Sequence, residues 1–281
     1  MSDPVPAITE AAATGEIAEI FVDIRRVLGV GVVNLIWRHL ATIPGALPRA
    51  WGILRAPYSD GAIAAEAAAL HADLDLLRLP PFPPEVLAAA GLFDGEISTI
   101  RNVLAAYDRT NAMALIAFSA LSLRLEDEPL TRDETLSCGG GVRREPPSAI
   151  PLPSLPNMAD LPPKIAELVL TLNRLGTRRS DPILASMYRH LAHWPSYLAL
   201  AWAMIAPRDA DGSLERSIAD AVTKARVHAA RVATRLRSPS AVPIEPSLRA
   251  AIRSAVEPFT GDVIAKMVVI CGALGAASGN S

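Results

Sequence analysis

The sequence repeats itself at an offset of about 151 positions, and this self-similarity constrains the fold more than any other feature of the chain. Pro44 is matched by Pro195 and Trp51 by Trp202, each 151 positions later. An insertion near 176–180 reconciles the small differences in offset between the matching stretches. Self-similarity on this scale indicates a duplicated structural unit. The matching stretches are Ile-Ala-Glu-Ile at 17–20 with Ile-Ala-Glu-Leu at 165–168, Trp-Arg-His-Leu-Ala at 37–41 with Tyr-Arg-His-Leu-Ala at 188–192, and Ile-Arg at 100–101 with Ile-Arg at 252–253.

The repeated unit is predicted to be helical. Alanine, leucine, arginine and glutamate dominate, and the apolar residues recur every three or four positions rather than every second one. We therefore predict an all-α fold of two tandem, pseudo-symmetric helical repeats that pack together, residues 1–130 and 164–281. The expected helices are 15–28, 32–43, 46–55, 60–78, 96–124, 161–176, 182–193, 196–206, 213–236 and 246–276.

Between the two repeats, residues 131–163 are predicted to form a long connection. This stretch contains Cys138, three consecutive glycines and several spaced prolines, which a regular helix cannot hold. The second cysteine, Cys271, lies in an apolar helical stretch, so the two cysteines do not indicate a disulfide framework. A reducing compartment is the simpler expectation.

Composition excludes several classes of partner. The chain has 281 residues, of which 51% are hydrophobic, and a net charge of -2 with its charges interspersed. That length and apolar content suffice for a core, and no basic stripe offers a surface to nucleic acid or to a membrane. The N-terminus carries acids and no apolar segment, so we expect a cytoplasmic protein without a signal peptide. An apolar, alanine-rich helical surface is compatible with a homodimer, although no residue pattern specifies one.

No metal or cofactor is expected. The sequence has no Cys-x-x-Cys pair, no Gly-x-Ser-x-Gly elbow and no phosphate-binding glycine loop. His190 and His193 lie about one helical turn apart, but no acid in their helix completes a set of metal ligands.

The duplication separates scaffold from candidate function, because polar residues that serve packing should recur in both copies. Arg38 and His39 recur as Arg189 and His190, and we interpret all four as structural. Asn111 does not recur, since Val263 stands 152 positions later. A carboxamide at the start of a buried helix face needs partners. It either bonds a neighbouring helix or points into a cleft.

Asp181 is the second residue that does not recur, because Val30 stands at the matching position. Asp181 precedes Pro182, a typical helix start with aspartate as the N-cap. The same carboxylate could serve as a general base if it were partly buried, since a helix dipole lowers its basicity. Both interpretations stay open on the residues alone.

These features together resemble the group I 2-haloacid dehalogenases. The resemblance is carried by the two-repeat helical layout, by Arg-His-Leu-Ala with a proline and a tryptophan downstream in each copy, by Asn111 in a long helix and by Ser180-Asp181-Pro182. It spans about 15–276. It implies a cofactor-free hydrolase in which an aspartate activates a water that displaces halide from C2 of a short 2-haloacid, with inversion and no covalent intermediate.

The resemblance also implies site residues. Asp181 would be the base, Asn111 would help to hold the water, and Ser180 would line the pocket. The family carries aromatic residues where this chain has Gly-Val-Val-Asn-Leu at 31–35, so its pocket should be wider, with Val32 and Leu35 in the lining.

Tyr107 and its counterpart Phe259 could supply aromatic lining instead, although their helical spacing also suits a core. The expected partner is a small carboxylic acid. An alternative function is a non-catalytic module that binds such an acid on the same scaffold.

Overall fold

The structure, a computed structural model, describes residues 5–75, 77–126, 152–236 and 243–279. Every regular element in these ranges is helical, which confirms the predicted all-α fold class. The first half contains α1 (Gly15–Leu28), α2 (Leu35–Leu40), α3 (Ala46–Ser59), α4 (Ala62–Asp73), α5 (Pro84–Ala89) and α6 (Asp94–Glu126). The second half contains α7 (Pro163–Arg174), α8 (Ser186–Leu191), α9 (Pro195–Ala210), α10 (Ser213–Ala233), α11 (Pro246–Pro258) and α12 (Ile264–Ala277). Most of the predicted connection, with Cys138, lies outside the described residues.

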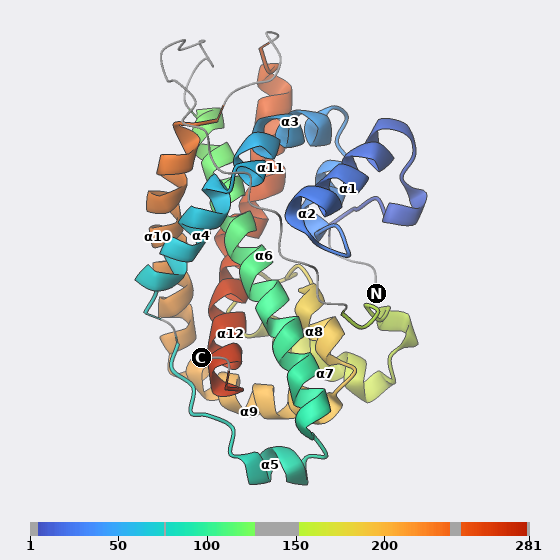
Figure 1. Ribbon diagram of the computed structural model, residues 1–281, viewed down its shortest axis with the longest axis vertical. Helices are drawn as coiled ribbons and strands as arrows, with labels where there is room; N and C mark the ends of the chain where they lie inside the picture. The colour runs from blue at the N-terminus through green and yellow to red at the C-terminus, as the bar shows by residue number, and fades with distance from the viewer. Residues whose placement is uncertain (1–4, 76, 127–151, 237–242, 280–281) are drawn as a thin grey trace.

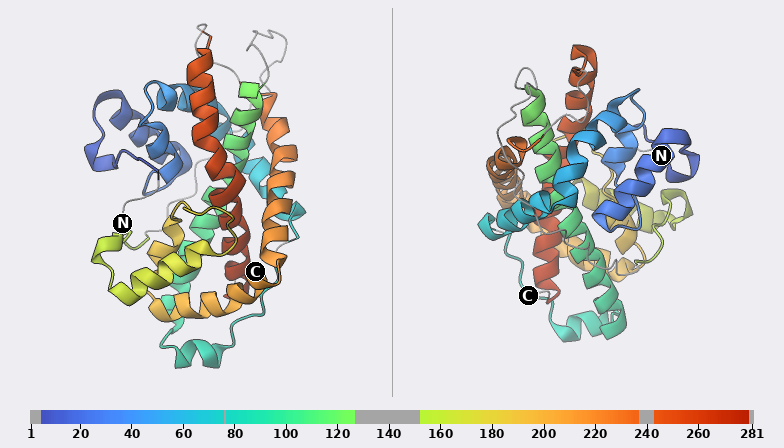
Figure 2. Two further views of the ribbon diagram at one scale, coloured as in Figure 1. Left: turned by 180° about the vertical axis from the view of Figure 1, so that it is seen from behind. Right: turned by 45° about the horizontal axis from the view of Figure 1, so that its top comes forward.

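The long helices form the centre of the molecule. Helix α6 packs along α12, α10 and α4, and α10 in turn packs against α12 and α4. Helices α1, α2 and α3 gather at one end of α6, whereas α7, α8 and α9 surround its other end (Figures 1 and 2). Two groups of three helices, α1–α3 and α7–α9, thus flank the central helices. The division into two repeats remains a prediction.

Helices α11 and α12 are joined by a single π-helical turn, Phe259–Val263. Together they span 246–277, the one stretch of the described chain long and apolar enough to cross a membrane by length and composition. Its most apolar window is 72% buried inside the protein. Most of its side chains therefore serve the core, as expected for the central helix of a packed domain.

An aromatic cluster anchors α2 to the rest of the core. Trp37 is fully buried, and its ring lies 5.4 Å from that of Trp51, 6.4 Å from that of Tyr58 and 4.6 Å from that of Phe118, measured between centroids. These rings come from α2, α3 and α6, so the cluster ties together three helices. The matched tryptophans differ, because Trp51 is buried whereas Trp202 is 43% exposed.

The structure corrects several predicted helix boundaries. The expected helix 182–193 is only Ser186–Leu191, and the expected helix 32–43 is only Leu35–Leu40. Asp181 is therefore not a helix N-cap, because the helix that follows it begins only at Ser186. The short helix Pro84–Ala89 was not expected from the sequence.

Candidate functional site

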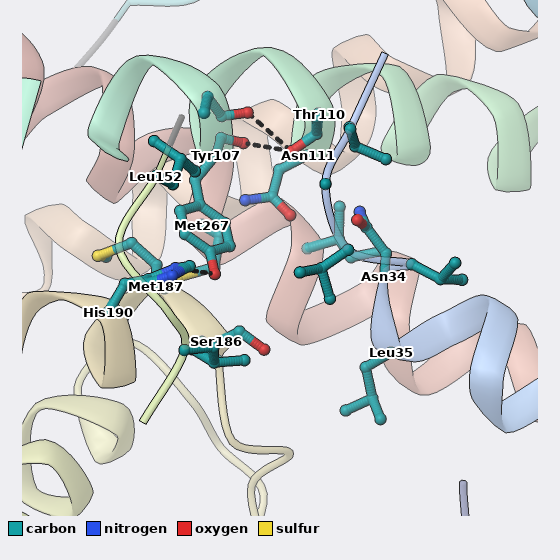
Figure 3. A pocket seen from close by; sticks show the side chains of 18 of the residues that line it. Asn34, Leu35, Tyr107, Thr110, Asn111, Leu152, Ser186, Met187, His190 and Met267 are labelled. Carbon is teal, nitrogen blue, oxygen red and sulfur yellow. Dashed lines mark hydrogen bonds between the residues drawn. The ribbon is translucent and has the colours of Figure 1, made fainter. Parts of the chain in front are cut away.

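A cavity of about 640 Å³ lies between the two groups of three helices. Its lining comes from the loop before α2, from α2 itself, from the middle of α6, from residues 152–155 and 183–187, and from the π-helical turn with the start of α12. Figure 3 shows side chains from these elements pointing toward one another. A cavity of this size suits a small organic molecule.

The charged residues that line this cavity are all positive. Arg38 and Arg109 line it, and the described lining contains no aspartate or glutamate. The Arg38 Nε donates to the Val33 carbonyl at 3.1 Å, and Arg109 reaches the Leu28 carbonyl at 3.4 Å. Most other lining residues are apolar. Such a cavity favours a ligand with an apolar body and a negative charge.

Asn111 supplies a buried amide to the cavity, and its side chain also interacts with the Cys271 thiol of α12. Its side chain is buried on α6, and the Nδ2 atom has no hydrogen-bond partner among the described residues. The carboxamide points into the cavity between Tyr107 and Asn34 (Figure 3). The hydroxyl of the neighbouring Thr110 is satisfied, because it donates to the Ala106 carbonyl at 2.8 Å. A thiol is only a weak hydrogen-bond partner, so a buried Nδ2 atom without a hydrogen bond leaves the amide able to bind a ligand or water in the cavity.

Tyr107 and His190 form a hydrogen-bonded pair in the same cavity. The Tyr107 hydroxyl lies 2.7 Å from the His190 Nδ1 atom, and the His190 Nε2 atom lies 2.8 Å from the Pro153 carbonyl oxygen (Figure 3). Burial lowers the pKa of His190 and outweighs the hydrogen bond to Pro153, which raises it; the charge of Arg189 makes a smaller lowering contribution. Burial also raises the pKa of Tyr107. Both groups are therefore neutral near pH 7.

The remaining predicted site residues divide into two groups. Val32, Leu35 and Phe259 line the cavity. Ser180 and Asp181 do not, and both are exposed on the segment between α7 and α8. The structure thus brings Asn111, Tyr107 and Phe259 together and leaves Asp181 apart from them.

The segment that follows Asp181 is held extended by a buried amide. The Asn173 Nδ2 donates to the Ile183 carbonyl at 3.2 Å, and its Oδ1 accepts from the Ala185 N–H at 3.0 Å. Lys266 of α12 donates to the Asn173 carbonyl at 2.7 Å. Because Ile183 and Ala185 line the cavity, these bonds fix one of its walls.

Lys266 should make stability depend on pH. It is fully buried, and burial lowers its pKa from 10.5 to about 8. Between these two values the unfolded chain binds the proton and the folded chain does not, so stability rises with pH. From pH 7.5 to 9.5 we expect the free energy of unfolding to rise by about 2 kcal/mol relative to Lys266→Met. Urea unfolding at several pH values measures this, with the exposed Lys164→Met as control. Parallel profiles for wild type and Lys266→Met would contradict it.

Three charged or titratable residues that line the cavity were not among the predicted site residues. Arg38 and His190 were interpreted as scaffold because they recur in both halves, and Arg109 was not singled out. The available signal was the spacing of Tyr107, Arg109 and Asn111 within one turn of α6. Residues 107 to 111 together present an aromatic, a cation and an amide.

The fold and the cavity define an all-helical protein with a largely apolar cavity whose charged lining residues are arginines. No protein-family model matches the chain. The chain is 31% identical, over 238 residues, to a configuration-inverting 2-haloacid dehalogenase of Alcaligenes xylosoxydans xylosoxydans, covering 80% of this chain and 77% of that protein. The chain therefore belongs to the 2-haloacid dehalogenase family.

Solved structures agree with this assignment at the level of the fold. A mutant D-2-haloacid dehalogenase superposes with a TM-score of 0.75 at 17% identity, over 99% of this chain and 97% of that one. A D-2-haloacid dehalogenase in complex with L-LA gives a TM-score of 0.69 at 18% identity, over 99% of this chain and 94% of that one.

Proposed function

We propose that this protein hydrolyses the carbon–halogen bond of short 2-haloalkanoic acids, by direct attack of water on C2 with inversion. The observation that carries this proposal is the cavity itself. It combines two guanidinium groups with the buried amide of Asn111, whose Nδ2 atom makes no hydrogen bond within the described protein, in a chain 31% identical to a configuration-inverting dehalogenase. No cofactor enters the proposed reaction.

The lining suggests how the substrate is held. The substrate carboxylate lies toward Arg38 and Arg109, because they are the positive groups of the lining. The Asn111 amide then holds either the attacking water or the departing halide, since both can accept its N–H. An apolar cavity strips water from the anion and its leaving group, which strengthens these contacts.

Direct attack by water fits this lining better than a covalent route. An ester intermediate would need a carboxylate nucleophile within reach of C2. The described lining offers none. Inversion in one displacement is therefore the chemistry that these residues support.

The group that activates the water is a separate question. The family resemblance predicts Asp181, with Ser180 beside it. From its exposed position, Asp181 would reach C2 only if the segment between α7 and α8 moved toward the cavity. The role of Asp181 remains a prediction.

Halide release from separate D- and L-2-chloropropionate, measured for wild type and Asp181→Asn, tests the proposed hydrolysis and the predicted role of Asp181. We expect wild type to release halide and to form the 2-hydroxy acid of opposite configuration. A base at Asp181 would make the variant at least about 100-fold slower. Its exposed position leads us to expect a much smaller effect. No halide from wild type with either enantiomer, nor with longer or bromo-substituted acids, would overturn the proposed hydrolysis.

The second candidate function is a module that binds a small acid without turnover. The lack of a carboxylate in the described lining favours it, because a site without a base can bind and not react. Calorimetric titration with 2-chloropropionate separates the two functions. Binding without halide release supports the module.

A further inference from the structure

We propose that the cavity is built for 2-haloalkanoic acids with a longer apolar chain, about six to ten carbon atoms in all, whose tail lies along the wall beside α8. This inference rests on the proposed hydrolysis and names the substrate class of the same site. It is independent of which group activates the water.

The cavity is much larger than a three-carbon acid. Its volume is about 640 Å³. At about 30 Å³ for each non-hydrogen atom, the volume of a molecule in liquid water, 2-chloropropionate occupies on the order of 200 Å³. Ligand cavities of this size usually enclose molecules with several times as many atoms. Roughly two thirds of the space is therefore left for a longer substrate.

The positive groups of the cavity lie on one side of it. Arg38 of α2 donates to the Val33 carbonyl, and Arg109 reaches from α6 to the Leu28 carbonyl. Both carbonyls belong to the end of α1 and the loop that follows it. The substrate carboxylate is drawn to this side, and C2 then lies near the Asn111 amide.

The opposite side of the cavity carries no charge among the described lining residues. It consists of residues 152–155, residues 183–187 and Met267, which have apolar or hydroxyl side chains. Figure 3 shows Met187 and Met267 on this side, away from Asn34 at the start of α2. An alkyl chain gains free energy here because it leaves water for an apolar surface. We call this side the tail wall.

The backbone of the tail wall is largely satisfied before a substrate arrives. Three carbonyl oxygens of the segment 153–156 accept hydrogen bonds from side chains of α8 and the turn after it. The pairs are Pro153 with His190 at 2.8 Å, Ser154 with His193 at 2.8 Å and Pro156 with Arg189 at 2.7 Å. These bonds hold the segment in place, and an apolar chain can pack against it without stripping water from these carbonyls.

Chain length changes the contacts of the tail and leaves the chemistry at C2 nearly the same. In 2-bromopropionate and every longer straight-chain acid, C2 carries one halogen, one hydrogen, one carboxylate and one alkyl group. Its reactivity toward water therefore changes little along the series. The gain from each added methylene reports the apolar surface that the tail wall buries, which amounts to about fourfold in kcat/KM.

Halide release from 2-bromopropionate, 2-bromobutyrate, 2-bromohexanoate and 2-bromooctanoate tests the tail wall in the wild-type protein. We expect kcat/KM for 2-bromohexanoate to exceed that for 2-bromopropionate by about 60-fold, mainly through a lower KM. A kcat/KM that stays level or falls from the three-carbon to the six-carbon acid, with halide release intact, overturns the tail wall and leaves the proposed hydrolysis standing.

A variant that fills the tail wall provides a second test. Ser186 begins α8, and its side chain lines the cavity on this side (Figure 3). Ser186→Phe should lower the ratio of kcat/KM for the six-carbon acid to that for the three-carbon acid by about tenfold or more. Ser196→Phe is the matched control, because it adds the same ring to a partly buried position of α9 outside the lining. Ser186→Phe with the wild-type ratio contradicts the proposed place of the tail.

Binding of acids without a halogen separates failure of the tail wall from failure of the hydrolysis. Calorimetric titration of wild type with hexanoate and with propionate should give a dissociation constant at least about tenfold lower for hexanoate. Equal affinities overturn the tail wall whether or not halide is released. No halide release from any acid of the series overturns the hydrolysis, and tighter binding of hexanoate then still supports the tail wall.

Discussion

Replacing Asn111 by leucine is expected to abolish most of the activity while stabilising the protein. The leucine removes the buried α6 amide that points into the cavity, so kcat for halide release should fall by about 100-fold to 1,000-fold. The same change removes a buried Nδ2 atom that makes no hydrogen bond within the described protein, and it gives up only a weak contact with the Cys271 thiol. We expect the free energy of unfolding to rise by about 1 kcal/mol for that reason.

The two opposite effects make this prediction specific. A residue that served only packing would lose stability and activity together. Halide assays and urea unfolding on the same preparation measure both quantities. Ser119→Ala is the control, because Ser119 is another buried polar residue of α6 and lies outside the cavity lining. Asn111→Leu with unchanged kcat would refute the role of the amide, and a loss of stability would show that it has a structural partner.

The all-α fold could be predicted because helical periodicity and alanine-rich composition agree along the chain. The predicted helix 182–193 was too long because Asp181 and Pro182 form a typical helix start. In the structure the side chain of Asn173 bonds the backbone at Ile183 and Ala185 and holds it extended. Such a tertiary contact outweighs a local signal, and nothing in the local sequence announces it.

Part of the candidate site could be predicted from the comparison of the two halves of the sequence. Asn111 was singled out as a polar residue without a counterpart, and the structure places it in the cavity. His190 was set aside because it has a counterpart in His39. That reasoning misses a case in which the repeated residue is the same and its neighbour differs. Tyr107 meets one histidine and Phe259 meets the other, so only one pair can form a hydrogen bond.

The same comparison separates the fold of this family from its chemistry. The cavity contains Asn111, Arg38 and Arg109, but Asp181, the residue expected to be the base, is exposed outside its lining. A proton acceptor can be supplied by any neutral basic group within reach of the water.

The largest effect on stability is expected for Trp37→Ala. Trp37 is fully buried and contacts the rings of Trp51 and Phe118, so its removal leaves a large cavity in the core. We expect a loss of about 3 to 5 kcal/mol in the free energy of unfolding, measured by urea denaturation. Trp202→Ala is the control, because Trp202 is 43% exposed and should cost less than about 1 kcal/mol.

Loss of Trp37 should also reach the active cavity. Helix α2 holds both Trp37 and the lining residues Leu35 and Arg38. With its aromatic anchor removed, α2 should hold Arg38 less firmly, and KM for 2-chloropropionate should rise more than kcat falls. Trp37→Phe keeps part of the ring contact and should recover part of the stability and of the KM. A variant that loses its stability but keeps the wild-type KM would show that the cavity is held by α6 and α8 without α2.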